Sequence, residues 1–536
     1  MKVVSVEETR RIEAEVDASL FSYEQMMQQA GAAAAARLRR RIDIKDGTRV
    51  TFLIGKGNNG GDGLVMAVDL ARHTPAQIGI YLLQPRPEND ALFSQALAAG
   101  LFVANAADDH DFRLLRSLIA SADIIVDALF GIGLRLPLRG AAAKVLRGVN
   151  LMIKRSAAPG TAEAGTVDRD ANGGRPFVFA LDCPSGVDCD SGEADANTLL
   201  ADETITFIAA KPGLFTFPAA RYAGELSIAQ IDIPESFPAL KAIKKTVLLD
   251  EGARSLLPAR PLDGHKGSFG KLLAVAGSPN YIGALALAAE AAYRAGAGLV
   301  TVGATGDLVR TVAGRLREPT YLRLPDTDGA INEAAVDLVV EQAQGYDALL
   351  LGCGLGRHPA TAAFVEEMLD AKSLPPLVVD ADALNILSEI PDWPRKVPAN
   401  SVITPHAGEM ARLSKSSVAE VNANRWELAA DAAADWNLVV LLKGAHSVIA
   451  EPSGQLSVIP FKTDALSTAG TGDVLAGVIA GLRAQGAAPY DSARLGAYVH
   501  ALAGTIAVER VGSSRSVIAG DVLAALGWAF KRIEGG

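Results

Sequence analysis

The sequence predicts an α/β protein of two successive domains, and three observations lead to this prediction. The chain has 536 residues, which at roughly 100–200 residues per domain is enough for two or three compact units. Short runs of apolar residues recur in both halves, and such runs are typical of strands buried on both faces of a parallel sheet. Alanine-rich stretches with helical spacing lie between the runs, as expected for helices that cover a sheet.

The first half follows the strand, loop and helix order of a doubly wound sheet. Residues 49–54 form a β-branched apolar run, residues 55–63 are rich in glycine, and residues 64–72 have helical spacing. We therefore expect a strand, a glycine loop and a helix in these segments. Further strands are expected at 78–83, 124–129 and 177–181.

The end of the first domain is marked by changes in pattern. Residues 151–175 are small and polar without periodicity, which predicts an exposed loop. This loop belongs to the first domain, because a buried-strand pattern resumes directly after it. The strand pattern stops near residue 233, and a connector follows. The sequence thus predicts one domain at 1–240 and a second at 245–536.

The second half repeats the same kinds of segment. A glycine-rich turn at 267–271 leads into a predicted strand at 272–276 and a long alanine-rich helix at 283–297. We expect a second α/β unit built on this pattern. Its other strands are expected at 299–302, 349–351, 377–379, 401–403 and 438–442.

Composition and charge narrow the classes of partner. The formal net charge of −10 argues against nucleic acid as the main partner of so long a chain. The three cysteines (Cys183, Cys189 and Cys353) are too few for a disulfide framework, so a cytoplasmic location is expected. No apolar stretch looks like a membrane span. We expect small-molecule partners, neither nucleic acid nor membrane, and the alanine-rich helices leave a homo-oligomer possible.

Three predicted strands of the first domain are followed by glycines and by an acidic or amide side chain. Asn59 and Asp62 follow the first strand, while Asp127 and Asp182 end two later ones. Ligands of open parallel sheets bind at the carboxyl ends of the strands, so these side chains are expected to converge. One such aspartate alone is more often a helix cap or turn residue, but three favour a shared site. The oxygen atoms of Asn59, Asp127 and Ser185 suit an alkali or alkaline-earth ion.

In the second half, residues 467–473 precede a predicted helix at 474–482 and are rich in glycine and threonine. Such a segment exposes backbone N–H groups at a helix N-terminus, which suits a transferring phosphoryl group. Asp473 is placed to take a proton from a substrate hydroxyl. A simple helix cap is the alternative, and the glycine and threonine content makes it the weaker one.

Other loops of the second half also follow predicted strands. Residues 443–447 are expected to face a phosphate, and residues 352–356 form another glycine loop. His406 lies in a loop after a strand, with a carboxylate three residues further on. Asp380 and Asp382 either orient a metal-bound nucleotide or cap a helix, and both interpretations stay open.

In this order, these segments resemble the bifunctional NAD(P)H-hydrate repair enzymes. The resemblance covers nearly the whole chain. Its motifs are GNNGGDG at 57–63, VDALFG at 126–131, DCPSG at 182–186, GSFGKLLAVAGS at 267–278, YRAGAGLVTV at 293–302, TPHAGE at 404–409 and AGTGDVLAG at 469–477.

The resemblance implies a fold and an activity for each domain. The first would be a Rossmann-like three-layer domain that interconverts the R and S epimers of hydrated NADH and NADPH. The second would be a ribokinase-like domain that dehydrates the S form back to NADH or NADPH. It would do so with magnesium and at the expense of ADP, giving AMP and phosphate.

The resemblance also assigns expected roles to residues. Those that would hold the hydrated cofactor in the epimerase are Asn58, Asn59, Gly60, Gly61, Asp62, Gly131, Ile132, Gly133, Leu134, Arg135, Leu136, Pro137 and Asp182. Those that would bind potassium are Asn59, Asp127 and Ser185. Those that would line the cofactor site of the dehydratase are Ala284, Gly354, His406 and Asp473. Those that would bind the nucleotide are Lys443, Gly444, Ala445, His446, Ser447 and Gly472.

Two of these residues are the candidates for catalysis. Asp182 is the expected proton shuttle of the epimerase. Asp473 is the expected base of the dehydratase, where phosphorylating the hydroxyl first would turn a poor leaving group into a good one. The alternative is a small-molecule kinase that uses Asp473 as the same base, preceded by a non-catalytic Rossmann-like binding module.

Overall fold

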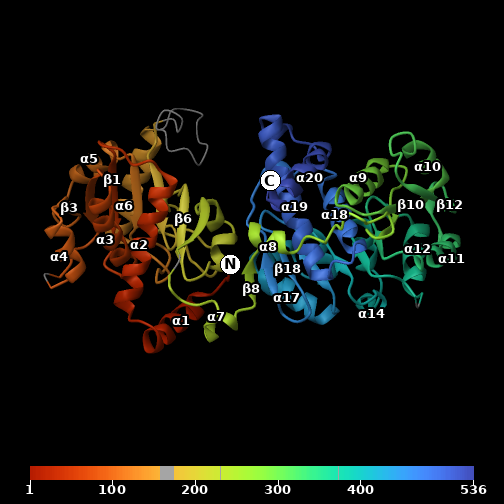
Figure 1. Cartoon of the computed structure of the whole chain (residues 1–536), viewed down its shortest axis with the longest axis horizontal. Coiled ribbons are helices and arrows are strands. Elements are labelled where there is room, and N and C mark those ends of the chain that lie inside the picture. Colours follow the sequence, from red (N-terminus) through yellow and green to blue (C-terminus); the bar gives the residue numbers. More distant parts are fainter. Residues whose placement is uncertain (88, 157–173, 230, 372, 536) are drawn as a thin grey trace. The chain divides into compact units, whose positions relative to one another are not determined.

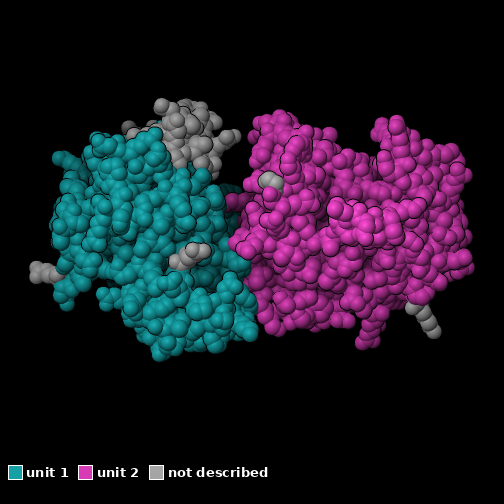
Figure 2. Space-filling view, in the orientation of Figure 1, with its two compact units in different colours: residues 1–243 teal, residues 244–536 magenta. Residues whose placement is uncertain are grey.

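The computed structural model describes residues 1–87, 89–156, 174–229, 231–371 and 373–535. The chain divides into two compact units, Met1–Ile243 and Lys244–Gly536, which Figure 2 shows in teal and magenta. In the part of the chain that the structure describes, no helix is both long and apolar enough to cross a membrane.

The first unit contains a seven-stranded parallel sheet in the order β3-β2-β1-β4-β5-β6-β7 (Figure 1). The strand order 3-2-1-4-5-6 is that of the Rossmann fold, which confirms the predicted fold class. The strands are β1 (Arg49–Ile54), β2 (Gln77–Leu82), β3 (Phe102–Asn105), β4 (Ile124–Ala128), β5 (Phe177–Leu181), β6 (Glu203–Phe207) and β7 (Glu225–Ala229). The helices are α1 (Val6–Ser19), α2 (Tyr23–Arg41), α3 (Asn58–His73), α4 (Ala91–Ala98), α5 (Arg113–Ser121), α6 (Gly140–Ser156) and α7 (Pro238–Lys241).

Helices cover both faces of this sheet, as the continuous apolar strands require. Phe52 and Ile54 of β1 belong to a core shared with α2, α3 and α4. Leu53, between them in the sequence, belongs to a second core with Leu115 of α5 and Val145 of α6. Successive strand residues point to opposite faces, so one apolar run supplies both cores. The result is the predicted three-layer arrangement.

Helix α3 begins earlier than the sequence suggested. The glycine segment was expected to be a loop through residue 63, but α3 starts at Asn58 and only residues 55–57 connect it to β1. The reason is close packing. A Cβ atom on Gly60 would lie 2.0 Å from the carbonyl oxygen of Gly55, and one on Gly63 would lie 2.6 Å from Ile54 Cδ1. These glycines let the first turns of the helix lie directly against the strand ends.

The expected loop at 151–175 is partly wrong. Helix α6 runs to Ser156, so the first six residues of this range are helical. Residues 157–173 lie outside the described residues. After them the chain enters β5, whose bounds agree with the prediction.

The second unit contains a ten-stranded sheet in the order β11-β10-β9-β14-β15-β16-β17-β18-β19-β8. Its strands are parallel from β11 to β17, and the pairs β17–β18 and β18–β19 are antiparallel. The strands are β8 (Lys245–Val247), β9 (Lys271–Val275), β10 (Leu299–Thr305), β11 (Thr320–Leu324), β14 (Ala348–Leu351), β15 (Leu377–Val379), β16 (Val402–Ile403), β17 (Val439–Leu442), β18 (Val448–Ala450) and β19 (Leu456–Val458), besides the small hairpin of β12 (Asp326–Thr327) and β13 (Ala330–Ile331).

The helices of this unit are α8 (Asp250–Ser255), α9 (Ile282–Arg294), α10 (Gly306–Val312), α11 (Val336–Ala343), α12 (Pro359–Leu369), α13 (Asp382–Leu387), α14 (Trp393–Lys396), α15 (Ala407–Leu413), α16 (Val418–Ala423), α17 (Arg425–Trp436), α18 (Thr471–Ala484), α19 (Pro489–Val511) and α20 (Ala519–Glu534). Helices α9, α18, α19 and α20 share one large core with alternate residues of the central strands, such as Leu272 and Ala274 of β9. The alanines of these helices have small side chains, so helices and sheet pack closely. An α/β fold is thereby confirmed for this half also.

Candidate functional site

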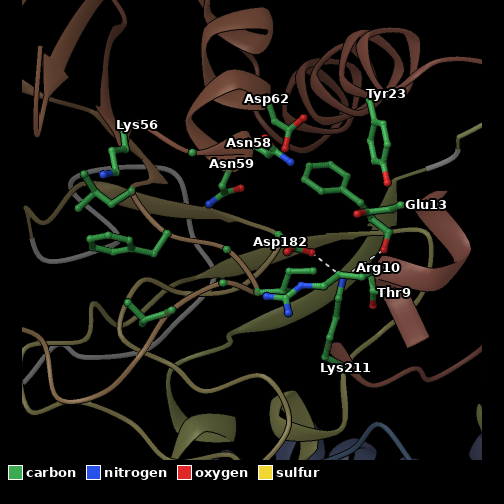
Figure 3. A pocket seen from close by; sticks show the side chains of 18 residues that line it. Thr9, Arg10, Glu13, Tyr23, Lys56, Asn58, Asn59, Asp62, Asp182 and Lys211 are labelled. Atoms are coloured by element: carbon green, nitrogen blue, oxygen red, sulfur yellow. Dashed lines mark hydrogen bonds and ion pairs between the residues drawn. The ribbon is translucent and has the colours of Figure 1, made fainter. Parts of the chain in front are cut away.

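The candidate site of the first unit lies at the carboxyl ends of β1, β4 and β5. The strand order reverses between β1 and β4, and ligands of open α/β sheets bind outside such a switch point. A cavity of about 560 Å³ lies there (Figure 3). It is lined by Thr9, Arg10, Glu13, Tyr23, Lys56, Gly57, Asn58, Asn59, Asp62, Leu129, Phe130, Gly131, Ile132, Gly133, Leu134, Asp182, Phe207 and Lys211.

An ion pair between Asp182 and Lys211 forms the floor of this cavity. Lys211 Nζ donates to Asp182 Oδ1 at 2.5 Å and to Thr206 Oγ1 at 2.9 Å, and its side chain is only 1% exposed. Burial by itself lowers the pKa of Lys211, but the contact with Asp182 raises it overall, so the amine stays charged. Asp182 has a φ of 62°, in the left-handed region that non-glycine residues rarely adopt. The chain therefore holds this carboxylate in one fixed position.

Two further acids face the same cavity. Asp62 comes from α3 and Glu13 from α1, a helix far from β5 in the sequence. Burial raises the pKa of Asp62 well above its usual range, and the charges of Asp182 and Glu13 raise it further. Burial and then Asp182 likewise raise the pKa of Glu13. Burial thus favours the protonated form of Asp62 beside an ion-paired carboxylate, and an acid next to a carboxylate suits proton transfer in both directions.

Three buried residues, Asp127, Ser185 and Asn59, provide oxygen atoms near the strand ends. Asp127 is 0% exposed and accepts from Ser185 N at 2.8 Å and Ser185 Oγ at 2.6 Å. Burial raises its pKa, and among the described residues only hydrogen bonds offset this, with no cation taking part. Both polar atoms of the Asn59 side chain lack a hydrogen-bond partner although the residue is 7% exposed. A buried carboxylate and an unpartnered amide oxygen fit a bound cation.

The structure distributes the predicted residues of the first unit unevenly. Most of them line the main cavity, and Gly131 lies against both Asn59 and Asp182. Gly60 and Gly61 are buried in the first turns of α3, and Arg135 is exposed. Leu136 and Pro137 line a separate hollow together with Asp195.

Sequence reasoning missed six residues of this cavity: Thr9, Arg10, Glu13, Tyr23, Phe207 and Lys211. The first four come from the two N-terminal helices, whose docking is a long-range event. Lys211 had a local signal, because a single charge among apolar residues in IAAKPGLF needs a buried partner.

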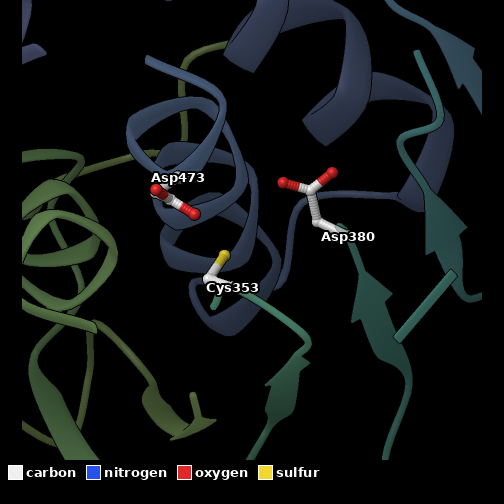
Figure 4. Close-up of side chains that lie close together, drawn as sticks. All are labelled: Cys353, Asp380 and Asp473. Carbon is white, nitrogen blue, oxygen red and sulfur yellow. The ribbon is translucent and has the colours of Figure 1, made fainter. Parts of the chain in front are cut away.

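The candidate site of the second unit centres on the first turn of α18. Gly470 is its N-cap with a φ of 92°, and Asp473 is the third residue of the helix. The ligand atoms of Asp473, Asp380 and Cys353 lie within 4.8 Å of one another (Figure 4). Asp380 follows β15 and Cys353 follows β14, so the site again lies at the carboxyl ends of parallel strands.

The environment of Asp473 suits a general base. Burial raises its pKa to about 6, and the charge of Asp380 contributes to this shift. A hydrogen bond from Cys353 acts in the opposite direction and favours the carboxylate. The Cys353 thiol is fully buried, and its pKa is raised well above the usual range by burial and by both acids. It therefore stays a neutral donor to Asp473.

Lys443 connects the acids on the other side of this site. Its Nζ donates to Asp380 Oδ1 at 2.6 Å and lies 3.9 Å from Glu409 Oε2. Thr404 Oγ1 also donates to Asp380 at 2.8 Å. Burial raises the pKa of Glu409 to about 7, although Lys443 lowers it in part. Gly472 adjoins this pair, because a Cβ there would lie 3.7 Å from Lys443 Nζ.

The loop Lys443–Ser447 is held by a residue that the sequence did not single out. Arg425, the first residue of α17, donates from Nη2 to the carbonyl oxygens of Leu442 at 2.9 Å and Lys443 at 3.0 Å. His446 is buried and donates from Nδ1 to the carbonyl oxygen of Ile459 at 3.1 Å. Burial lowers the pKa of His446 to about 4, so it is neutral near pH 7. Its imidazole supports the loop from within.

The remaining predicted residues lie around the neighbouring strand ends. Gly354 has a φ of 63°, and a Cβ on it would lie 2.8 Å from Ala284 Cβ, so these two residues adjoin. His406 caps α15, and its Nδ1 accepts from Gly408 N at 2.9 Å. Asp382 Oδ2 accepts from the backbone N of Gly356 at 2.9 Å and so fixes that glycine loop. Glycine at 354 thus lets its loop pack directly against the start of α9.

Both sites have the same construction: acids and glycines at the carboxyl ends of a parallel sheet, beside the N-terminus of a packed helix. They define a two-unit α/β enzyme. One family model, described as YjeF-related protein N-terminus, matches residues 23–213, and another, described as NAD(P)H-hydrate dehydratase, matches residues 272–524. The chain belongs to the family of bifunctional NAD(P)H-hydrate repair enzymes.

Relatives match along nearly the whole chain. The bifunctional NAD(P)H-hydrate repair enzyme Nnr of Moorella thermoacetica is 37% identical over 517 residues, which are 95% of this chain and 92% of the relative. That of Escherichia coli is 31% identical and covers 94% of this chain and 88% of the relative. The ADP/ATP-dependent NAD(P)H-hydrate dehydratase of Bacillus subtilis, co-crystallised with ATP/Mg²⁺, is 29% identical with a TM-score of 0.46; the match covers 54% of this chain and 99% of that one.

Proposed function

We propose that this chain repairs hydrated NADH and NADPH. The first unit interconverts the R and S epimers, and the second dehydrates the S form to NADH or NADPH while ADP is converted to AMP and phosphate. The observation that carries this proposal is that both acid sites occur in one chain that matches bifunctional repair enzymes over most of their length. Its partners are small molecules, and a cytoplasmic location remains our prediction.

The acids of the first unit support the epimerase activity. Interconversion of two epimers requires a bond at the hydroxyl-bearing carbon to break and to form again on the other face, while a proton moves to and from the oxygen. Asp182, which Lys211 holds at 2.5 Å, accepts that proton, and Asp62, whose protonated form burial favours, donates one. Both face the same cavity, so one bound ring is within reach of both groups.

Potassium is a cofactor that the oxygen atoms of this unit fit. Asn59 Oδ1, the Asp127 carboxylate and Ser185 Oγ would hold it, because the first is an unpartnered acceptor and the second is a buried acid without a cation. When bound, the ion would supply a positive charge beside the cavity. Asp127 and Ser185 would then order the chain near Phe130, whose N donates to Ser185 Oγ at 3.0 Å.

Asp473 supports the dehydratase activity. It takes the proton of the ring hydroxyl while that oxygen attacks the terminal phosphorus of ADP, the bond from this phosphorus to the bridging oxygen breaks, and AMP leaves. Phosphate then leaves the ring with its electron pair, and loss of a ring proton completes the double bond. The N–H groups of Gly470 to Asp473 at the start of α18 stabilise the phosphoryl group in transfer.

Lys443 and the loop behind it support nucleotide binding. Lys443, together with the backbone of Gly444 to Ser447 and of Gly472, would contact the phosphates of ADP. The cluster of Cys353, Asp380 and Asp473 fits magnesium poorly, because sulfur is a soft ligand and Asp380 already pairs with Lys443. Magnesium instead belongs with the phosphates of the nucleotide, where it would neutralise their charge.

The recovery of NADH tests both activities in one experiment. We would follow absorbance at 340 nm with a mixture of both NADH-hydrate epimers, the full chain, magnesium, potassium, and either ADP or ATP. Complete recovery of NADH is the expected result. Recovery of only the amount of NADH that the S epimer can give would support the dehydratase activity and contradict the epimerase activity. No recovery with either nucleotide would overturn the repair function and favour the small-molecule kinase instead.

A further inference from the structure

A second cavity adjoins the catalytic cavity of the first unit. It measures about 400 Å³, and its walls share Lys56 and Phe130 with the main cavity. The rest of its lining comes from Leu83 and Gln84 after β2, from Arg139, and from the first three residues of α6. No carboxylate lines this cavity within the described residues, so we call it the basic side cavity.

The two cations of the basic side cavity are available to a ligand. Lys56 and Arg139 are both exposed, and neither forms an ion pair with another described residue. Arg86, another cation of this region, is already engaged. It donates to Asp90 at 2.6 Å and to the carbonyl oxygen of Gly55 at 3.0 Å. Arg10 is also exposed and forms no ion pair with another described residue, but it lines the acidic part of the main cavity, where its charge lowers the pKa of Glu13.

Lys56 lies apart from the acids of the main cavity, whereas Arg10 and Lys211 lie beside those acids (Figure 3). Figure 3 shows Lys56 at the opposite end of the cavity from Glu13 and Tyr23. Glu13 and Asp62 lie away from Lys56 (Figure 3). After burial, the charge of Asp182 raises the pKa of both acids, and the charge of Glu13 raises that of Asp62 further. At the end with Glu13 and Asp62 a phosphate group would meet acids as well as cations, whereas the described lining of the basic side cavity offers Lys56 and Arg139 without a carboxylate.

We propose that the basic side cavity binds a phosphate group of the hydrated dinucleotide. This inference rests on the proposed epimerase function of the first unit. The hydrated ring, which is uncharged, lies against Asp62 and Asp182, and the phosphate lies between Lys56 and Arg139. The charge distribution thereby sets the direction in which the substrate enters. Two phosphate groups share this chemistry: the pyrophosphate of both substrates and the additional 2′-phosphate of hydrated NADPH.

Steady-state epimerisation by the full chain tests this placement. In the absence of ADP the dehydratase does not consume substrate, so conversion of the R to the S hydrate can be followed by chromatography. We expect Lys56→Ala and Arg139→Ala each to raise KM about three- to tenfold with little change in kcat, since charge-assisted contacts bind the substrate away from the reacting carbon. Lys144→Ala is the matched control, because Lys144 is an exposed lysine of α6 outside the cavity lining.

A comparison of the two substrates identifies the phosphate group. An equal rise of KM for hydrated NADH and hydrated NADPH assigns the cavity to the pyrophosphate. A rise for hydrated NADPH alone assigns it to the 2′-phosphate. An unchanged KM for both substrates in the double variant of Lys56 and Arg139 overturns the proposal.

Chemical labelling tests the cavity without relying on activity. The full chain is acylated at its lysines with and without inorganic pyrophosphate, and the rate at each lysine is measured by mass spectrometry. Protection of Lys56 but not of Lys144 is expected. Equal acylation rates at Lys56 with and without pyrophosphate would overturn the anion site. If the wild-type chain does not interconvert epimers, the proposed epimerase function fails, but the labelling result still decides whether the cavity binds an anion.

Discussion

Lys211 Nζ lies 2.5 Å from Asp182 Oδ1, and the two residues come from different loops at the end of the sheet. The lysine also donates to Thr206 Oγ1 at 2.9 Å and to the carbonyl oxygen of Phe207 at 3.2 Å, so all three of its hydrogens have acceptors. A buried cation with every donor satisfied holds its anionic partner in one geometry. The Asp182 carboxylate is thus ordered before a ligand binds.

Replacing Asp182 should strongly reduce epimerisation while dehydration continues. Asp182→Asn keeps the size of the side chain but removes the proton acceptor. We expect epimerisation to fall by at least a factor of about 100, as is usual for loss of a general acid or base. The readout is R-to-S conversion by chromatography, and dehydration of the S hydrate in the second unit serves as an internal control. Epimerisation at the wild-type rate would exclude Asp182 as the proton acceptor.

Lys211→Met separates the effect on stability from that on chemistry. It leaves the Asp182 carboxylate without its partner, and breaking a buried pair in this way costs about 3–5 kcal/mol. We expect the unfolding transition of the first unit to move to lower denaturant concentration. Lys241→Met, at an exposed position on α7, is the matched control and should leave the transition in place. Equal transitions for both variants would show that the ion pair contributes nothing to stability.

The potassium prediction depends on Asn59. We expect epimerisation to be faster in KCl than in the chloride of a large organic cation at equal ionic strength. Asn59→Ala removes an unpartnered buried oxygen without removing a charge, and it should raise the half-saturating potassium concentration about tenfold. Rates that do not depend on the cation in the wild-type chain would refute the site.

Much of the fold follows from local patterns. The bounds of β1, β5 and β15 agree with the predicted runs, because strands buried on both faces consist of little but apolar residues. The acids that end these strands were also recognisable, since a parallel sheet brings its strand ends to one edge. The start of α3 could not be recognised in the same way. Its glycines permit close packing against the end of β1, and this contact is visible only in the folded structure.

The parts of the site that escaped prediction depend on distant packing. Glu13 reaches the cavity because α1 docks near residues about 200 positions away, and its sequence is that of any charged helix. In the second unit the sequence predicts that Lys443 faces a phosphate. It does not predict the ion pair of Lys443 with Asp380, because the two residues are 63 positions apart in the chain. Asp380 had two open interpretations, and the structure favours an anchor for this lysine over a helix cap.

Asp473 sets the pH dependence of dehydration. As a base it must be ionised, and its pKa is about 6, so kcat/KM should fall as the pH drops below 6. Cys353→Ala removes a hydrogen bond to the carboxylate, which raises this pKa and moves the acid limb to higher pH. Cys353→Ser keeps a donor and should leave the limb near its original position. A limb that is the same in all three proteins would show that Cys353 does not act on Asp473.

The same raised pKa implies that Asp473 lowers the stability of the second unit. An aspartate has a pKa of roughly 3.9 in an unfolded chain, so the folded unit binds more protons than the unfolded one between about pH 4 and 6. The wild-type chain therefore loses stability relative to a neutral side chain as the pH rises through this window, and the full difference is present above it. Asp473→Asn should stabilise the second unit by about 1–3 kcal/mol at pH 8 and by less at pH 5.

Denaturant unfolding at the two pH values measures this difference. The variant should also lose dehydration while it still binds ADP, because the asparagine cannot take the hydroxyl proton but leaves Lys443 and Gly472 in place. Asp464→Asn, outside the cluster formed with Cys353 and Asp380, is the control for loss of one negative charge. The stabilisation of Asp473→Asn relative to the wild type should be larger at pH 8 than at pH 5. If the variant is inactive but this stabilisation is the same at both pH values, ionised Asp473 does not destabilise the fold, and its role as a base with a raised pKa is contradicted.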